Sequence, residues 1–344
     1  MPAAPEGTIP YSQGRAAQPA ALARIVSRVA AQLDVPSRMS AARRPVFTGI
    51  GASHAALALP VRLLEEHGLP ARRVLAGDLV PEAVFADADL VIGVSQSGRS
   101  TETLDALDQV PREHRAALVN AASSPLAESA AHRIDLGSEP DSYASTVGYT
   151  GTLIALTMIA RALTGRQPAQ VTAEWAGIAG LLEEQERAIA TTVDEFAVRA
   201  ADTVAADLVA SGAARSVTEA GALLLREVCR VPATALATRN YLHGAMESAG
   251  GTLHVTVGDG RELDLARTLA EAGHPTLALT SAPLTGAGLL HVAPIPGHLS
   301  QPVRTVLQTI VVQRLAGALA QARGVDIEDF VFHHADTKSE EPVG

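Results

Sequence analysis

The chain has 344 residues, more than the ~100–200 of a typical domain, so we expect two domains. A formal net charge of −10 argues against a nucleic-acid binder, which usually presents a basic face, and 3% aromatic residues argue against ring stacking as the main binding device. The single cysteine, Cys229, excludes an intrachain disulfide, and the longest apolar stretch, 151–160, is well short of the ~20 residues that span a bilayer, so a cytoplasmic protein is predicted.

Residues 1–44 are predicted to hold a loose leader, 1–19, and one helix, 20–33. Residues 45–170 then alternate between short apolar runs and helical patterns. Strands are predicted at 45–49, 73–75, 89–94, 116–120 and 132–136. Helices are predicted at 54–66, directly after the third strand, from about 125 and at 145–163. Such alternation is typical of a parallel, doubly wound sheet.

Residues 171–202 are predicted to be connecting helices, and residues 203–325 repeat the alternation. Strands are predicted near 208–209 and at 252–257, 276–280 and 289–292, with helices at 220–228, 261–272 and 303–322. Residues 326–344 form a C-terminal tail. The two halves suggest a duplicated unit, so the predicted fold is α/β, with two flavodoxin-like three-layer α/β/α units and parallel sheets.

A run of polar side chains follows the clearest strand of the first half. Ser95, Gln96, Ser97 and Ser100 surround a glycine at the point where this strand passes into a helix. Ligands bind beyond the carboxyl ends of parallel strands, and a helix N-terminus favours an anion. A helix cap needs only one hydroxyl, so the run predicts an anion site. Ser53, after the neighbouring strand, is expected to point into the same crevice or to cap its own helix.

Several segments resemble the sugar isomerase (SIS) domain family, and above all the isomerase half of glucosamine-6-phosphate synthase and the stand-alone AgaS-like and fructosamine-deglycase-like proteins. The run 95–103, SQSGRSTET, is similar to the family's SQSGET-type loop. Residues 51–53 and 143–146 are similar to its G-T-S and VAST segments. Residues 221–227 resemble its G-A-L-K-L-K-E helix, and His243-Gly244 follows Glu227 at the family's interval of sixteen residues.

The resemblance implies a role for each matched residue. The loop serines, Gln96 and Ser53 would hold the phosphate of a sugar phosphate. Ser145 and the backbone near Tyr143 would contact the sugar. Glu227 would move a proton between two sugar carbons, and His243, often donated by the second subunit of a homodimer, would assist ring opening. We expect no cofactor. We also expect no metal, because no carboxylate–histidine motif with ligand spacing surrounds the pair His333-His334.

The chain departs from the family in ways that leave its reaction open. Leu224 stands in place of a lysine, and the tail around His333, His334 and Lys338 lacks the family's proline and arginine. No glutaminase half is visible, so amination would need a separate glutaminase. We therefore expect an isomerase or an amino-sugar-phosphate deaminase or deglycase. A non-catalytic sugar-phosphate-binding module and an aminating subunit without its glutaminase half are the alternatives.

Overall fold

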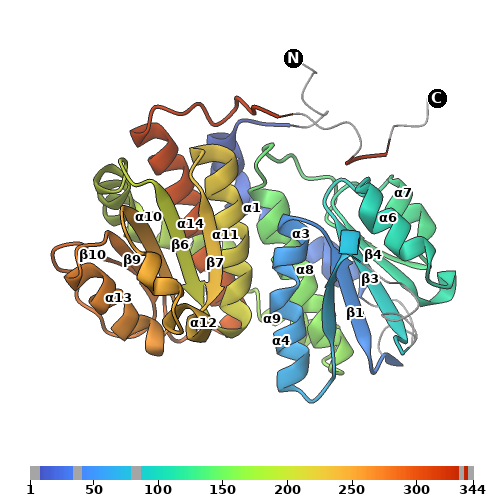
Figure 1. Ribbon diagram of the computed structural model, residues 1–344. Coiled ribbons are helices and arrows are strands. Elements are labelled where there is room, and N and C mark those ends of the chain that lie inside the picture. Colours follow the sequence, from blue (N-terminus) through green and yellow to red (C-terminus); the bar gives the residue numbers. More distant parts are fainter. Residues whose placement is uncertain (1–7, 34–40, 79–86, 333–336, 340–344) are drawn as a thin grey trace. The chain divides into compact units, whose positions relative to one another are not determined.

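A computed structural model describes residues 8–33, 41–78, 87–332 and 337–339. The chain forms two compact units, each with one five-stranded sheet (Figure 1). The N-terminal unit comprises Ala20–Pro140, Val147–Ala176 and Val331–Gly344. The C-terminal unit comprises Met1–Pro19, Asp141–Thr146 and Gly177–Phe330.

The sheet of the N-terminal unit has the order β2-β1-β3-β4-β5, and all of its neighbouring strands are parallel. Its strands are β1 (Pro45–Gly49), β2 (Arg72–Leu75), β3 (Leu90–Ser95), β4 (Arg115–Val119) and β5 (His132–Asp135). Every residue of β1 and β3 is buried, as expected for central strands that are covered on both faces.

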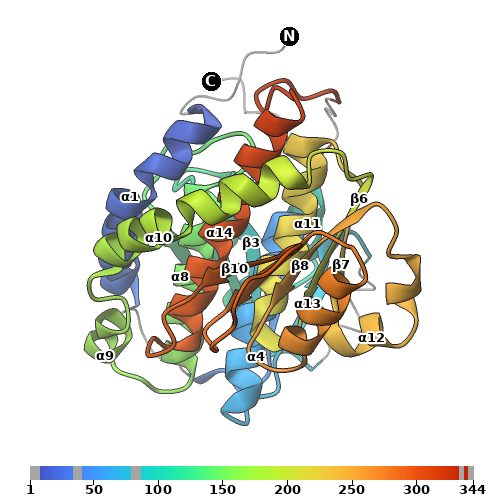
Figure 2. The same ribbon diagram turned by 90° about the vertical axis from the view of Figure 1, so that its left-hand side faces the viewer.

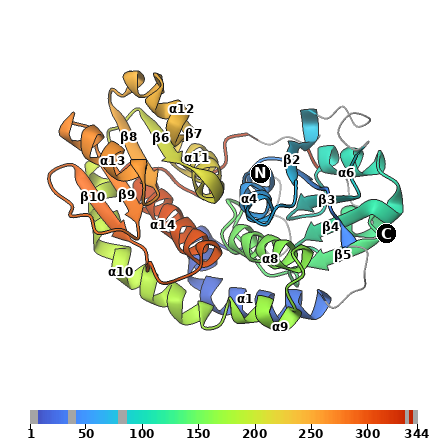
Figure 3. The same cartoon turned by 90° about the horizontal axis from the view of Figure 1, so that it is seen from below.

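Helices cover both faces of this sheet (Figure 3). They are α3 (Ala52–Ala56), α4 (Ala58–Glu66), α6 (Thr101–Asp108), α7 (Pro125–Ser129), α8 (Val147–Leu163), α9 (Pro168–Ala173) and residues 20–32 of α1 (Tyr11–Gln32). A buried cluster that includes Val91, Leu107 and Leu126 joins β3 to α6 and α7. Helices α3, α4 and α8 lie on the opposite face.

The sheet of the C-terminal unit has the order β10-β9-β8-β6-β7, again with parallel neighbours throughout. Its strands are β6 (Ala205–Ala210), β7 (Ala233–Ala237), β8 (Thr252–Val257), β9 (Thr276–Thr280) and β10 (Leu290–Pro294). Its helices are α10 (Ile178–Arg199), α11 (Arg215–Cys229), α12 (Thr238–Leu242), α13 (Arg261–Glu271) and α14 (Gln301–Ala322). Helix α10 packs along α14 (Figure 2), whereas α12 and α13 share the other face through Tyr241, Leu265 and Leu269.

The predicted fold class is confirmed. When the strands of each sheet are matched by their order in the chain, β6 corresponds to β1, β8 to β3 and β9 to β4. The second unit thus repeats the topology of the first, as the alternating pattern suggested. Among the described residues, no helix is both long enough and apolar enough to cross a membrane.

Two local predictions were wrong, and two elements were missed. Residues 11–19 are not a loose leader but the start of α1, because Tyr11 is buried and anchored: its backbone N–H donates to Glu328 Oε1 at 2.8 Å and its hydroxyl to the Gln313 carbonyl at 2.8 Å. The predicted helix 54–66 is divided at Leu57 into α3 and α4. Strand β7 and helix α12 were not predicted at all.

Candidate functional site

The polar run after β3 forms a compact loop at the carboxyl end of the N-terminal sheet. Strand β3 ends at Ser95 and α6 begins at Thr101. The Ser95 side chain is 2% exposed, and its hydroxyl oxygen lies 3.0 Å from that of Ser100. The hydroxyl of Ser97 accepts from the Arg99 N–H at 3.3 Å. The loop therefore gathers three hydroxyls where the first-turn N–H groups of α6 begin, an arrangement that suits an anion.

Gly98 fixes the shape of this loop. Its φ is +66°, and a Cβ atom at this position would lie 2.1 Å from the hydroxyl oxygen of the buried Ser124. Its N–H donates to the Ser95 carbonyl at 3.1 Å, and its own carbonyl accepts from the Leu126 N–H at 3.1 Å. Only glycine tolerates both the positive φ and the close approach.

Replacement of this glycine should destabilise the fold. Gly165 has a φ of +83° with nothing within 4 Å of an added Cβ, so Gly165→Ala meets the backbone strain alone, about 1–2 kcal/mol. Gly98→Ala adds the clash with Ser124 and should lower the free energy of unfolding by clearly more than this control. Urea unfolding of both variants measures the difference, and equal losses would show that the loop moves aside without cost.

Ser53 lies at the end of the strand next to β3. Gly49 ends β1, and a Cβ on Gly49 would lie 2.9 Å from the Val94 carbonyl oxygen and 3.2 Å from Ser53 Cβ, so this glycine lets the Ser53 turn approach the end of β3. Ser53 does not cap its helix, because the cap residue is Gly51 with φ 58° and no side-chain cap bond. Within the described residues, neither the Ser53 hydroxyl nor the Gln96 amide has a hydrogen-bond partner, which leaves both available to a ligand.

The C-terminal tail pairs with the same loop. Lys338 forms an antiparallel bridge with Ser100, the Ser339 N–H donates to the Arg99 carbonyl at 2.9 Å, and the Thr101 N–H donates to the Thr337 carbonyl at 3.4 Å. The backbone of Lys338 is thus held beside the loop. His333 and His334 lie outside the described residues. In the described part of the chain, no three His, Cys, Asp or Glu side chains gather as a metal site would require.

Tyr143 and Ser145 belong to the C-terminal unit and not to the unit that carries the loop. The carboxylate of Asp141 organises their turn: it accepts from the Ser145 hydroxyl at 2.6 Å and from the N–H and hydroxyl of Thr146, each at 2.9 Å. Tyr143 is 47% exposed, and its ring centre lies 4.1 Å from that of Phe330. The Ser145 hydroxyl therefore donates inward, and its oxygen lone pairs remain to accept from a ligand.

Glu227 and His243 also belong to the C-terminal unit. Glu227 lies in the last turn of α11, and desolvation raises the pKa of its carboxyl from 4.5 to about 7. Glu227 is exposed to solvent on one side, but nearby protein atoms partly desolvate its carboxyl. This desolvation disfavours the charged form. His243 is exposed directly after α12. No hydrogen bond links these two side chains to each other or to any other described residue.

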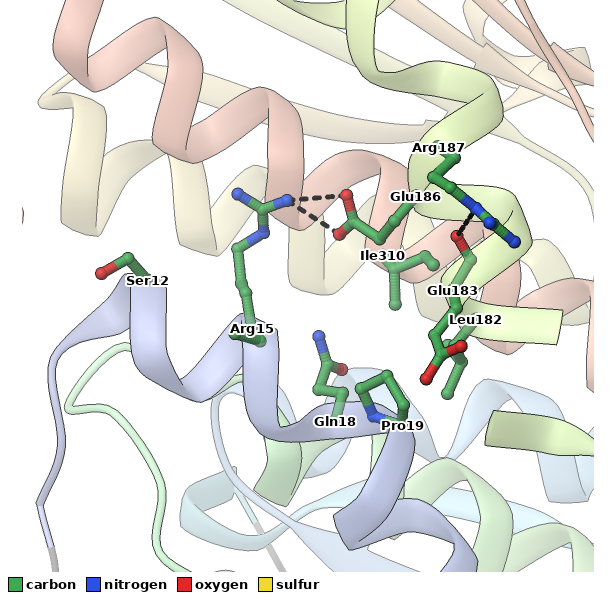
Figure 4. Close-up of a pocket in the computed structure, with 10 residues that line it drawn as sticks. Ser12, Arg15, Gln18, Pro19, Leu182, Glu183, Glu186, Arg187 and Ile310 are labelled. Carbon is green, nitrogen blue, oxygen red and sulfur yellow. Dashed lines mark hydrogen bonds and ion pairs between the residues drawn. The ribbon is translucent and has the colours of Figure 1, made fainter. Parts of the chain in front are cut away.

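A hollow in the C-terminal unit lies outside this candidate site. It measures about 480 Å³ and lies between the start of α1, α10 and Ile310 of α14 (Figure 4). Its wall holds the ion pair between Arg15 Nη2 and Glu186, with N–O distances of 2.7 and 3.0 Å. The residues that line this hollow belong to helices and not to the turns at the carboxyl ends of the strands, where α/β sheets bind ligands.

The chain is similar in sequence to known proteins. Residues 38–162, which contain the loop, match the SIS domain family. Glutamine–fructose-6-phosphate aminotransferase (isomerizing) from Pseudomonas putida is 28% identical over 286 residues, which are 76% of this chain and 46% of that protein. The chain therefore spans less than half the length of the curated relatives that it matches.

Solved structures share the whole fold. The C-terminal domain of glucosamine-fructose-6-phosphate aminotransferase from Francisella tularensis superposes with a TM-score of 0.79 at 18% identity, over 94% of this chain and 99% of that one. Tagatose-6-phosphate ketose/aldose isomerase from Escherichia coli gives a TM-score of 0.75 at 16% identity, over 97% of this chain and 99% of that one. On this match, residues 38–162 contain a SIS domain, and the chain as a whole shares its fold with these solved structures.

Proposed function

We propose that this protein binds a sugar phosphate, specifically an amino-sugar phosphate, and moves a proton between two neighbouring carbons of the sugar. The observation that carries the proposal is the convergence of the Ser95, Ser97 and Ser100 hydroxyls with the start of α6, beside the partner-free Ser53 and Gln96 side chains of the described structure. Neutral donors and a helix N-terminus hold a phosphate without any net positive charge. Lys338, whose backbone is bridged to Ser100, would add one positive charge.

Glu227 is the proposed base. Aldose–ketose exchange removes a proton from the carbon next to the carbonyl, gives an enediol (or an enolamine from an amino sugar) and returns the proton to the former carbonyl carbon. A carboxyl with a pKa of about 7 suits this work, because a base is most effective when its pKa lies near the working pH. A phosphate held at the far end of the sugar supplies the binding energy that positions this carbon.

The remaining residues would position the sugar. The Ser145 hydroxyl donates its proton to Asp141, so its oxygen would accept a hydrogen bond from a sugar hydroxyl. The backbone near Tyr143 would make a further contact with the sugar. His243 would assist ring opening. Its exposure fits a side chain that completes the site of a second copy in a homodimer.

The pH profile of activity tests the base. Because Glu227 must be deprotonated to accept a proton and its pKa is raised to about 7, kcat/KM should rise with pH and level off above an apparent pKa near 7. Initial rates between about pH 3.5 and 9 at low substrate measure this limb and cover the ordinary carboxyl range. A limb near the ordinary carboxyl pKa of ~4.3 would contradict the assignment.

Two measurements together test the proposed function. A thermal-shift panel of hexose, pentose and amino-sugar phosphates should find a ligand that stabilises the chain, by about 2.7 kcal/mol at ~100 times its dissociation constant. Proton NMR in D2O should then show loss of the sugar C–H signal next to the carbonyl, as enediol formation requires. Binding without exchange would instead favour a non-catalytic module, and product formed only with added ammonia would favour an aminating subunit.

A further inference from the structure

The C-terminal unit has its own cavity at the sheet edge that corresponds to the phosphate loop. Strands β6, β8 and β9 match β1, β3 and β4, so the turn 258–260 after β8 corresponds to the loop after β3. A cavity of about 210 Å³ opens at this edge, and its lining includes Ser211, Gly258, Asp259, Glu262, Arg304 and Gln308. All of these residues belong to one unit.

A carboxylate occupies the position that would receive an anion. Glu262 is 6% exposed and lies in the first turn of α13. It accepts from the Thr238 hydroxyl at 2.5 Å, the Ser211 hydroxyl at 3.1 Å and the Gly260 N–H at 3.3 Å. A Cβ on Gly258 would lie 2.8 Å from Glu262 Oε2, so the carboxylate lies directly over the turn. A second anion would be repelled at this place.

The cavity has a net negative charge, whereas the loop of the N-terminal unit presents neutral hydroxyls. Asp259 adds a second carboxylate, which accepts from the Thr280 hydroxyl at 2.8 Å and from Arg304 Nη1 at 2.9 Å. Burial raises the pKa of Asp259, but hydrogen bonds from Ser281 and Thr280 and the charge of Arg304 together outweigh it and hold the pKa below its usual value, so the carboxylate stays charged. Two carboxylates face one guanidinium, and the balance favours a cation.

Polar groups at this cavity remain without partners. Gln308 is 8% exposed and lines the cavity, yet its amide makes no hydrogen bond to any described residue. Arg304 Nε is buried and likewise has no partner in the described part of the chain. A carboxylate offers about four acceptor sites, and Glu262 fills three of them. Buried polar groups are nearly always satisfied, so these groups point to a bound polar ligand.

We propose that this cavity is a second binding site, for a small ligand that carries an ammonium group and hydroxyls, such as an unphosphorylated amino sugar. Glu262 would accept from the ammonium group, while Gln308 and Arg304 would bind the hydroxyls. The volume of about 210 Å³ is below the ~300–1,000 Å³ of pockets for drug-sized ligands, and it suits a single sugar ring.

Titration calorimetry of the full chain with D-glucosamine and with D-glucose tests this site. The wild type should bind glucosamine at least tenfold more tightly than glucose. Glu262→Gln removes the charge, and Gln308→Leu removes the amide while it keeps the volume; each should weaken glucosamine binding at least tenfold. Glu271→Gln, an exposed control on the same helix, should bind as the wild type does.

The outcome is independent of the phosphate loop. In Ser95→Ala/Ser97→Ala, glucosamine should still bind with wild-type affinity even where sugar phosphates no longer do. Glucosamine binding that is lost in this double variant, but kept in folded Gln308→Leu, would assign the ligand to the N-terminal unit and overturn the second site. Equal affinity for glucose and glucosamine would overturn the proposed selection for a cation.

Discussion

Glu227→Gln should lower kcat by ~10²–10⁴-fold and leave the affinity for the sugar phosphate within about twofold of the wild type, because the variant loses the base and keeps the size of the side chain. Steady-state rates give kcat, and calorimetry gives the affinity. An interaction made only in the transition state lowers kcat and kcat/KM together, so the two constants should fall in parallel.

Stability provides a check that the loss is not unfolding. The folded state raises the pKa of Glu227, so the wild type loses stability as pH rises from the unfolded value near 4.5 to about 7, where the carboxyl becomes charged. Glu227→Gln lacks this loss and should be at least as stable as the wild type at pH 8. Glu195→Gln, an exposed control on α10, should keep full activity. Full activity in Glu227→Gln would mean that the base is another residue.

Ser95→Ala/Ser97→Ala should weaken sugar-phosphate binding by at least ~100-fold. A hydrogen bond to a charged group contributes about 1.5–3 kcal/mol, or roughly 10–100-fold in affinity for each hydroxyl removed. Ser95 has a further effect, because its loss also removes the 3.0 Å partner of the Ser100 hydroxyl. Calorimetry with the best ligand of the thermal-shift panel measures the change.

Ser27→Ala is the matched control for this double variant. Ser27 is exposed on α1 in the same unit, and its hydroxyl donates only to the Ala23 carbonyl of its own helix, at 3.2 Å. The Ser27→Ala variant should bind the sugar phosphate with the affinity of the wild type. If the double variant also binds like the wild type, the loop does not hold the phosphate.

The strands that sequence reasoning located best are fully buried ones. Strands β1, β8 and β9 coincide with the predicted ranges, since each is buried along its whole length. Strand β7 escaped prediction because it lies at the edge of its sheet and is Ala- and Thr-rich, with only its first residue buried. The first turns of α1 escaped because distant partners, Glu328 and Gln313, anchor Tyr11.

The parts of the site that could be predicted are those made by residues close together in the sequence, and the parts that were missed mostly depend on distant segments. The hydroxyl loop after β3 was predictable because its residues are neighbours in sequence and its glycine marks the turn. The pairing of Lys338 with Ser100 joins segments far apart in the chain, and the tail offers no periodic pattern to reveal it. Asp141 was missed although it lies four residues before Ser145, a spacing at which a carboxylate can bind a turn hydroxyl. Ser124 was missed because only the fold brings it under Gly98.

A crystal structure of the protein with the sugar phosphate that stabilises it most would test the central claim most directly. We expect the phosphate oxygens within hydrogen-bond distance of the Ser95, Ser97 and Ser100 hydroxyls and of the first-turn N–H groups of α6. A phosphate group bound elsewhere on the chain, with this loop empty, would contradict the account.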